Sequence, residues 1–366
     1  MMDMGYNRKL ILPDGEEYYG FAFGAADDKV LEIVFNTSMV GYQEILSDPS
    51  YTDQAVVMTY PLIGNYGMAA DDYETKVPTV GAFIVREYND EPSNFRSEKS
   101  LAEVMIRYQI AGIYGVDTRK LTRSIRNKGS RRVLLTAADT SLDVGLRMLS
   151  DAAVPNDAVS RVSCGSIWRS ASKCGRFHVV AIDCGMKLNI VRSLNAKGCD
   201  VTIVPWNTPA ETINALKPDG VFISNGPGDP TDVQPVINTV RSLRGKYPMF
   251  GICLGHQIIA LAYGAQTYKL KFGHRGGNHP VKDLTTGKIE ITSQNHSYAV
   301  DADSLGKTPL QCTHINLLDN TVEGMACKAD RVFSVQYHPE SAPGPQDSAY
   351  LFDRFTKLLE EEQSHA

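Results

Sequence analysis

The sequence predicts an α/β protein in two parts, in which a mostly parallel sheet flanked by helices follows a smaller mixed α+β domain. Its 366 residues suit two domains of ordinary size. From residue 177 onward, short apolar runs alternate with helix-forming segments, which is typical of a parallel sheet covered on both faces. The first half has strand and turn patterns without this regular alternation, so we expect a separate domain there.

Composition and charge exclude several classes of protein. Apolar residues make up 43% and charged residues 22% of the chain, as in an ordinary globular protein. The net charge of −5 provides no overall attraction to nucleic acid or to an anionic membrane. No apolar run approaches the roughly 18 residues of a membrane-spanning helix, and the N-terminus lacks the apolar core of a secretory signal. We therefore expect neither nucleic acid nor a membrane as a partner.

The cysteines indicate a reducing compartment. Their number, seven, is odd, and no CxxC pair occurs, so neither a disulfide framework nor a structural zinc site is expected. Buried, inert thiols in a cytoplasmic protein are the simplest interpretation. A reactive cysteine among them has to be recognised from its local sequence.

We expect an N-terminal domain at residues 1–150, a linker at 151–176 and a C-terminal domain at 177–366. The linker segment is small, polar and irregular, with a proline and glycines that interrupt regular structure. In the N-terminal domain, apolar and β-branched runs predict strands at residues 29–37, 54–60 and 79–86, followed by a short helix at 101–108.

The C-terminal domain begins with four strand–helix units. The apolar runs predict strands at residues 177–183, 200–205, 221–224 and 249–252. The segments between them predict helices at residues 187–197, 210–216 and 233–244, and a fourth that begins at Leu254 or Gly255. After residue 265 the pattern changes to strands and turns, and an amphipathic helix at 349–361 closes the chain.

The fourth strand runs into a pattern that suits a nucleophilic cysteine. Cys253 stands in Gly-Ile-Cys-Leu-Gly, between an apolar strand and a helix-forming stretch, as in a nucleophile elbow with cysteine in place of serine. The two glycines let the strand and the helix approach closely. The helix N-terminus favours the thiolate, and the amide of Leu254 points to where an oxyanion would form. By itself the pattern also fits a buried structural cysteine, so a base is needed to decide.

A histidine and a carboxylate follow a later strand. Residues 332–336 read as a strand, and Tyr337-His338-Pro339-Glu340 comes directly after it. Pro339 favours extended backbone at His338, and residues two apart in an extended segment point the same way. Glu340 could therefore hold one ring nitrogen of His338 and leave the other for Cys253, as in a Cys-His-acid triad. A lone His-Pro-Glu is more often a surface turn, but the cysteine elbow upstream favours catalysis.

A third segment, SNGPGDP at residues 224–230, follows the end of a predicted parallel strand. A phosphate-binding loop is the obvious rival, but the segment has neither a Gly-Lys-Ser/Thr ending nor a GxGxxG pattern. Gly226 and Gly228 instead offer exposed backbone N–H groups. These could serve an oxyanion or a substrate at the strand end, where ligands bind in such folds.

Together, GICLGHQ, SNGPGDP and the late HPE resemble the class I glutamine amidotransferases. Further segments resemble, more narrowly, the small subunits of carbamoyl phosphate synthetases. They are KFGHRGGNHPV, AIDCGMKLNIVR and ITSQNHSYAV in the second half, and VFNTSMVGYQEILSDPSY, TYPLIGNYG and GVDTRKLTR in the first. The resemblance covers nearly the whole chain. It implies a class I glutaminase domain preceded by an N-terminal domain particular to these subunits.

The resemblance implies a role for each matching residue. Cys253 would attack the side-chain amide carbon of glutamine, His338 would transfer protons and Glu340 would orient His338. The oxyanion hole would consist of the backbone amides of Gly226 and Leu254. Glutamine would be bound by Ser50, Gly226, Gly228, Gln257, Asn295, Ser297 and Tyr298. Because Ser50 comes from the first domain, the site would lie at the domain junction.

Two further residues need comment. Position 297 departs from the family pattern, in which glycine is common, and a positive φ there would strain a serine. His256 lies beside the elbow, and we expect it to support the site rather than to take part in catalysis.

The resemblance also implies a partner. The chain has no phosphate-binding loop and no second large α/β unit for a nucleotide, so ATP and Mg²⁺ would bind elsewhere, and this chain would need no cofactor or metal of its own. The implied partner is a large ATP-grasp synthetase subunit that receives ammonia through a tunnel, in a heterodimer or a higher oligomer of heterodimers. The basic residues within 117–132 fit either a docking surface for that subunit or a solvated helix face.

Other functions stay open at this point. A free-standing cysteine hydrolase, or the glutaminase subunit of another amidotransferase, could use the same elbow, although the N-terminal segments suit neither. A non-catalytic subunit would not need the complete set of Cys253, His338 and Glu340. The sequence does not decide between arginine and pyrimidine biosynthesis.

Overall fold

The computed structural model describes residues 5–365, which form two compact units. One unit comprises the chain up to Pro155 together with Lys271–Arg275, and the other comprises Asn156–Leu270 and the chain from Gly276 onward. The expected linker at 151–176 is thus divided between them. Most of it belongs to the second unit, where it carries helix α5 (Ala158–Val162) and strand β10 (Trp168–Ser170).

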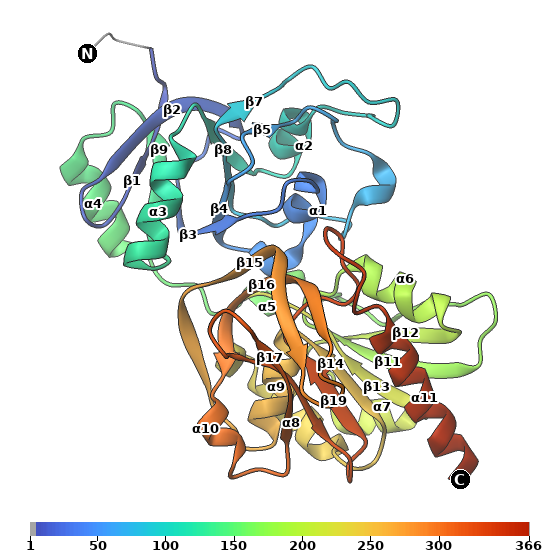
Figure 1. The fold of residues 1–366 in the computed structure, drawn as a ribbon. Coiled ribbons are helices and arrows are strands. Elements are labelled where there is room, and N and C mark those ends of the chain that lie inside the picture. The colour runs from blue at the N-terminus through green and yellow to red at the C-terminus, as the bar shows by residue number, and fades with distance from the viewer. Residues whose placement is uncertain (1–4, 366) are drawn as a thin grey trace. The chain divides into compact units, whose positions relative to one another are not determined.

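The first unit is built on a closed β-barrel (Figure 1). Its strands, in the order in which they pair, are β1 (Arg8–Ile11), β2 (Glu17–Gly24), β8 (Ala111–Tyr114), β6 (Ala82–Ile84), β4 (Gln54–Met58), β3 (Lys29–Asn36) and β9 (Arg131–Ala137). The pairing of β1 with β9 closes the barrel. The strands predicted at 29–37, 54–60 and 79–86 correspond to β3, β4 and β6. The closure itself was not predicted, because it joins segments far apart in the chain.

Helices cover both faces of these strands. They are α1 (Tyr42–Ser47), α2 (Leu101–Arg107), α3 (Thr118–Lys128) and α4 (Leu142–Asp151), with short 3₁₀ turns η1 (Pro49–Tyr51) and η2 (Ala70–Asp72) and a strand pair β5 (Leu62–Ile63) and β7 (Glu87–Tyr88). Helix α2 begins with a capping box, in which Ser100 and Glu103 bond to each other's backbone amides. Phe83 of β6 packs in the same cluster as residues of α1 and α2, whereas its neighbour Ile84 packs with Leu121 of α3.

The second unit contains a ten-stranded sheet. Its strands, in spatial order, are β10, β12 (Cys199–Pro205), β11 (Phe177–Asp183), β13 (Gly220–Ile223), β14 (Met249–Ile252), β19 (Val332–Val335), β18 (Val322–Cys327), β16 (Ile289–Val300), β15 (Thr267–Asp283) and β17 (Gln311–Asn316). From β12 to β19 the neighbours run parallel, and the carboxyl ends of these strands therefore lie at one edge.

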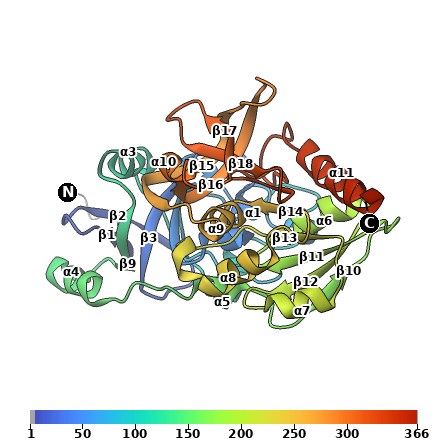
Figure 2. The same cartoon turned by 90° about the horizontal axis from the view of Figure 1, so that it is seen from below.

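Helices cover both faces of this sheet. They are α6 (Leu188–Ala196), α7 (Ala210–Ala215), α8 (Gln234–Leu243), α9 (Leu254–Ala262), α10 (Ala302–Leu305) and α11 (Tyr350–His365), with the turn η3 (Pro230–Asp232). Apolar residues of α7, α8 and α9 pack in one core cluster, and those of α6 and α11 pack in another. Figure 2 shows α7 and α8 on one side of the parallel strands and α11 on the other. The predicted α/β class and strand–helix alternation are confirmed. No helix among residues 5–365 combines the length and apolar character needed to cross a membrane.

Candidate active site

Cys253 occupies a strained turn between β14 and α9. Its backbone has φ 54° and ψ −104°, a conformation that is unfavourable for a residue other than glycine. A Cβ on Gly255 would lie 2.2 Å from the carbonyl oxygen of Ile223, and one on Gly251 would lie 2.8 Å from the oxygen of Gly255. Only glycines therefore allow the strand and the helix to meet this closely. The nucleophile elbow that the sequence predicts is present, and Cys253 stands at the N-terminus of α9.

Strand pairing brings the segment of His338 beside Cys253. Strands β14 and β19 run parallel with Ile252 opposite Val335, and the amide of Cys253 donates to the carbonyl oxygen of Val335 at 2.9 Å. Both strands end at the same edge, so the residues that follow them are neighbours. His338 is buried, and its backbone amide donates to the carbonyl oxygen of Ser293 at 2.9 Å.

His338 and Glu340 form a buried pair. The Nδ1–H group of His338 donates to Oε1 of Glu340 at 2.7 Å. Burial by itself lowers the pKa of His338, but the Glu340 carboxylate and the Cys253 thiol outweigh burial and raise it to about 10. The imidazolium form is thus favoured at neutral pH. The two side chains meet as the sequence predicts, but the predicted extended geometry is wrong: Pro339 and Glu340 form a turn, in which the amide of Ser341 donates to the carbonyl oxygen of His338 at 3.1 Å.

Lys187 completes this arrangement, although sequence reasoning assigned it no role. Its Nζ lies 3.0 Å from Oε1 of Glu340, and both side chains are almost fully buried. Burial raises the pKa of Glu340, but Lys187 and His338 together outweigh burial and lower it to about 2. Asn189 adds a hydrogen bond from Nδ2 to the backbone oxygen of Glu340. The only sequence signal was the position of both residues at the start of the helix predicted at 187–197, which follows the predicted parallel strand at 177–183.

Gly226 lies close to the start of α9. A Cβ on Gly226 would lie 2.1 Å from the carbonyl oxygen of Cys184 and 2.8 Å from the side chain of Leu254. No larger residue fits there without displacement of the loop. The amide of Leu254 belongs to the first turn of α9, where N–H groups have no acceptor within the helix. The structure therefore brings together the two residues whose amides the resemblance assigns to an oxyanion hole. Gly228 follows in the same loop with φ 89°.

The residues expected to bind glutamine are distributed over both units. Gln257, Asn295, Ser297 and Tyr298 belong to the second unit, and the carbonyl oxygen of Asn295 accepts a hydrogen bond from the thiol of Cys253 at 3.6 Å. Ser50 belongs to the first unit, where it is buried in η1 and its amide donates to Oδ1 of Asp48 at 2.9 Å.

Gln257 and Ser297 differ in one respect each from what the sequence suggested. The Nε2 group of Gln257 donates both to the carbonyl oxygen of Tyr298 at 2.8 Å and to Oε1 of Gln336 at 3.0 Å. Both side-chain N–H groups of Gln257 thus donate to protein oxygens, which leaves its side-chain oxygen Oε1 for other contacts. Ser297 lies within β16 and is not among the residues with positive φ, so the strain considered for a serine at this position does not arise.

His256 is buried in α9, and its Nδ1 lies 3.0 Å from the hydroxyl oxygen of Ser334. Burial lowers the pKa of His256 to about 3, which keeps the ring neutral at physiological pH. His256 is therefore neutral where His338 is cationic, and of these two residues His338 has the carboxylate partner. This supports the expectation that His256 is structural.

Two family models match the chain. The glutamine amidotransferase class-I model matches residues 180–358, and the model of the carbamoyl-phosphate synthase small chain, CPSase domain, matches residues 10–135. The second match falls within the first unit, and the first match falls within the second unit except for Lys271–Arg275. The elbow, the His–Glu pair and the parallel sheet thus belong to a class I glutamine amidotransferase.

Curated relatives identify the family more closely. The carbamoyl phosphate synthase small chain of Fusobacterium nucleatum is 52% identical over 97% of this chain and 99% of its own length. That of Staphylococcus haemolyticus is 52% identical over 97% of this chain and 96% of its own. The pyrimidine-specific small chain of Bacillus subtilis is 49% identical over 96% of both. The chain belongs to the carbamoyl phosphate synthase small chains and is the glutaminase subunit of such a synthase.

Proposed function

We propose that Cys253, His338 and Glu340 hydrolyse L-glutamine to glutamate and ammonia through a thioester on Cys253. The observation that carries this proposal is the register of β14 and β19, which brings a strained cysteine at a helix N-terminus beside a buried imidazole–carboxylate pair. The thiolate attacks the amide carbon, the C–N bond breaks, and ammonia leaves with a proton from the imidazolium of His338. Water then attacks the thioester carbon while His338 accepts a proton from the water, and the C–S bond breaks, which releases glutamate and returns Cys253 to the thiolate.

The charge that develops on the amide oxygen requires hydrogen-bond donors. We assign them to the backbone amides of Gly226 and Leu254, because the two residues are adjacent and no side chain could replace the hydrogen of Gly226. Glutamine itself is held by Ser50, Gly226, Gly228, Gln257, Asn295 and the backbone at Ser297 and Tyr298. In this pocket, the arrangement at Gln257 favours a supporting role for its N–H groups and a direct role for its oxygen.

Glu340 has two functions in this mechanism. It fixes the tautomer of His338 and stabilises the imidazolium, as carboxylates do in catalytic triads. Lys187 in turn keeps Glu340 ionised in its buried position. We assign Lys187 to positioning rather than to catalysis, because its partner is the carboxylate.

The ammonia passes to a large ATP-dependent synthetase chain, which makes carbamoyl phosphate from bicarbonate and supplies the sites for ATP and Mg²⁺. The name of the relatives, a small chain of a synthase, supports such a partner. The first unit provides docking surface for the large chain. We expect the complex to work in the cytoplasm.

The decisive experiment compares two nitrogen sources in the complex of this chain with its large chain. Cys253→Ser should abolish carbamoyl phosphate formation from glutamine and leave formation from added ammonia near the wild-type rate. Cys174→Ser, which changes an exposed thiol, should leave both rates unchanged. Glutamine-dependent synthesis by the Cys253→Ser complex would refute the assignment of the nucleophile.

A further inference from the structure

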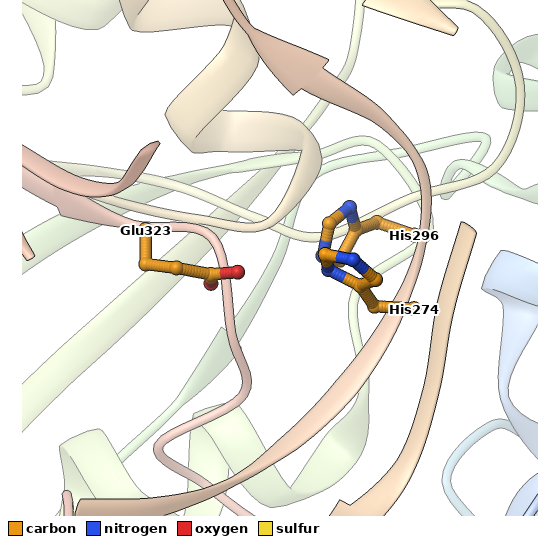
Figure 3. Close-up of side chains that lie close together, drawn as sticks. All are labelled: His274, His296 and Glu323. Carbon is orange, nitrogen blue, oxygen red and sulfur yellow. The ribbon is translucent and has the colours of Figure 1, made fainter. Parts of the chain in front are cut away.

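A chain of buried polar side chains ends at the backbone of Tyr298. It starts at Glu323 in β18, passes through Gln294 in β16 and reaches His296. Figure 3 shows the Glu323 carboxylate with the rings of His296 and His274, and one ligand atom from each of the three lies within 4.8 Å of the others. Neither Glu323 nor Gln294 has a role in the mechanism above.

The Glu323 carboxylate fixes the orientation of Gln294. Nε2 of Gln294 donates to Oε2 of Glu323 at 2.9 Å and to the hydroxyl of Thr292 at 3.1 Å. An ionised carboxylate can only accept hydrogen bonds, so the NH₂ end of the amide has to face it. The other oxygen of Glu323 accepts from Nδ2 of Asn316 at 3.1 Å. As a result, Oε1 of Gln294 points to His296.

This orientation determines the protonation of His296. Nε2 of His296 lies 2.7 Å from Oε1 of Gln294, and Nδ1 lies 2.8 Å from the carbonyl oxygen of Tyr298. Both partners are acceptors, so each ring nitrogen has to carry a hydrogen. His296 is therefore an imidazolium, and Glu323 provides the balancing negative charge through the amide of Gln294. In a buried site such a balance is required for a charge to persist.

The carbonyl oxygen of Tyr298 accepts two side-chain hydrogen bonds. It accepts from Nδ1 of His296 and from Nε2 of Gln257, both at 2.8 Å. A carbonyl oxygen has two lone pairs, and these two donors use both. The orientation of the peptide plane after Tyr298 is thereby fixed, and so is the β16 backbone that the glutamine site uses.

We propose that Glu323 is a positioning residue for glutamine binding, which holds His296 as an imidazolium and through it the backbone of Tyr298. This rests on the proposed function, since the backbone at Tyr298 is assigned there to the glutamine site. A neutral residue at position 323 would let the Gln294 amide turn over and donate to His296. The ring of His296 would then lose one proton and, with it, the hydrogen bond that it donates to one of its two partners.

A metal ion is the other use to consider for Glu323, His296 and His274. An imidazole binds a metal through a nitrogen lone pair. Both ring nitrogens of His296 face acceptors and carry hydrogens, so the ring has no lone pair to offer. The hydrogen-bond network therefore favours the positioning role.

The test uses Glu323→Gln, which keeps the size of the side chain and removes its charge. In ¹⁵N NMR spectra of the histidine-labelled full chain at pH 7, with His296 assigned through His296→Gln, the wild type should show two protonated ring nitrogens and the variant only one. In the complex with the large chain, KM for glutamine should rise about tenfold, as expected for loss of one charge-assisted hydrogen bond, with little change in kcat. Inactivation of Cys253 by iodoacetamide without glutamine should be unchanged.

Glu290→Gln is the matched control. Glu290 is an equally buried carboxylate in β16, the strand of Gln294 and His296, but its partners are Lys288 and Ser348. Its substitution should leave both the His296 spectrum and KM unchanged. A neutral His296 in the wild type would overturn the proposal, even if Glu323→Gln failed to fold. So would a variant in which His296 loses a proton while KM stays the same. Failure of the Cys253 assignment would appear in the nitrogen-source experiment and would not alter the spectrum.

Discussion

The two units use β structure in different ways. In the first unit the sheet closes on itself, so each barrel strand pairs on both sides, and apolar side chains are buried on both faces of the strands. In the second unit the sheet stays open, and its parallel strands lead into polar residues at one edge: Asp183, Ser224, Cys253 and His338. Functional side chains lie together at the carboxyl ends of an open parallel sheet because the loops that follow the strands converge there. A closed barrel has its apolar side chains buried and mainly contributes stability. Changes to the two units should therefore affect different measurements.

The largest effect is expected at the strand ends of the second unit. His338→Asn removes the proton carrier and should lower kcat for glutamine hydrolysis by about 10²–10⁴-fold. Glu340→Gln should lower it less, because the helix N-terminus and the intrinsic nucleophilicity of the thiolate remain. The measurements are kcat and the pH profile of Cys253 alkylation by iodoacetamide, made on a Cys174→Ser background to remove an exposed thiol.

Lys187 requires a control in this experiment. Glu340→Gln leaves the buried ammonium of Lys187 without its carboxylate, which can destabilise the unit by about 3–5 kcal/mol. The double variant Lys187→Met and Glu340→Gln removes both charges and separates loss of stability from loss of catalysis. Equal losses of kcat for Glu340→Gln and His338→Asn would mean that the carboxylate does more than orient the imidazole. No loss at all would mean that Cys253 and His338 act as a dyad.

An intermediate effect is expected in the barrel. Phe83 is fully buried in β6, and Phe83→Ala should lower the unfolding free energy of the first unit by about 3–5 kcal/mol. Both tryptophans of the chain, Trp168 and Trp206, belong to the second unit, so tryptophan fluorescence should miss this change while far-UV circular dichroism detects it.

Phe222→Ala is the counterpart in the second unit, because Phe222 is equally buried in β13. This substitution should shift the unfolding transition that tryptophan fluorescence reports. If Phe83→Ala shifted that transition by the same amount, the two units would unfold together and the comparison would have to be abandoned.

The smallest effect separates two buried histidines of the second unit, His256 and His338. The pKa of His256 is about 3 in the folded chain and about 6.5 when unfolded, so the unfolded chain binds more protons between these values. Its contribution to stability is fully present above pH 6.5 and is lost as the pH falls toward 3. Between pH 7 and pH 5 the loss is about 2 kcal/mol.

Urea unfolding followed by tryptophan fluorescence at pH 7 and pH 5 measures this loss, and His256→Asn should remove it. His338 should behave in the opposite sense. Its folded pKa, about 10, lies above the unfolded value, so its contribution is present below pH 6.5 and is lost as the pH rises through 10. A wild-type protein and a His256→Asn variant with the same pH dependence would contradict a neutral His256.

How far the sequence predicts the structure depends on how local each signal is. The strand–helix alternation and the turn at Cys253 are encoded by neighbouring residues, and both were predicted. The closure of β1 on β9 was not, because no short segment records a pairing between residues more than a hundred positions apart. Lys187 was overlooked for a similar reason. A lysine before a helix has the appearance of a surface residue, and only the folded sheet buries it against Glu340.

The strand β15 runs from Thr267 to Asp283, yet Lys271–Arg275 in its middle belongs to the first unit. The amide of Ser130 donates to the oxygen of Lys271, and Phe272 stacks on Phe35 with ring centroids 5.9 Å apart. A gene divided after the codon for Pro155 would therefore encode all seven strands of the barrel but not Lys271–Arg275, which is translated only after much of the second unit. During synthesis, the barrel strands are all available once the chain has passed Ala137, whereas the contacts of Phe272 and Lys271 with the first unit form only after residue 275 has been added.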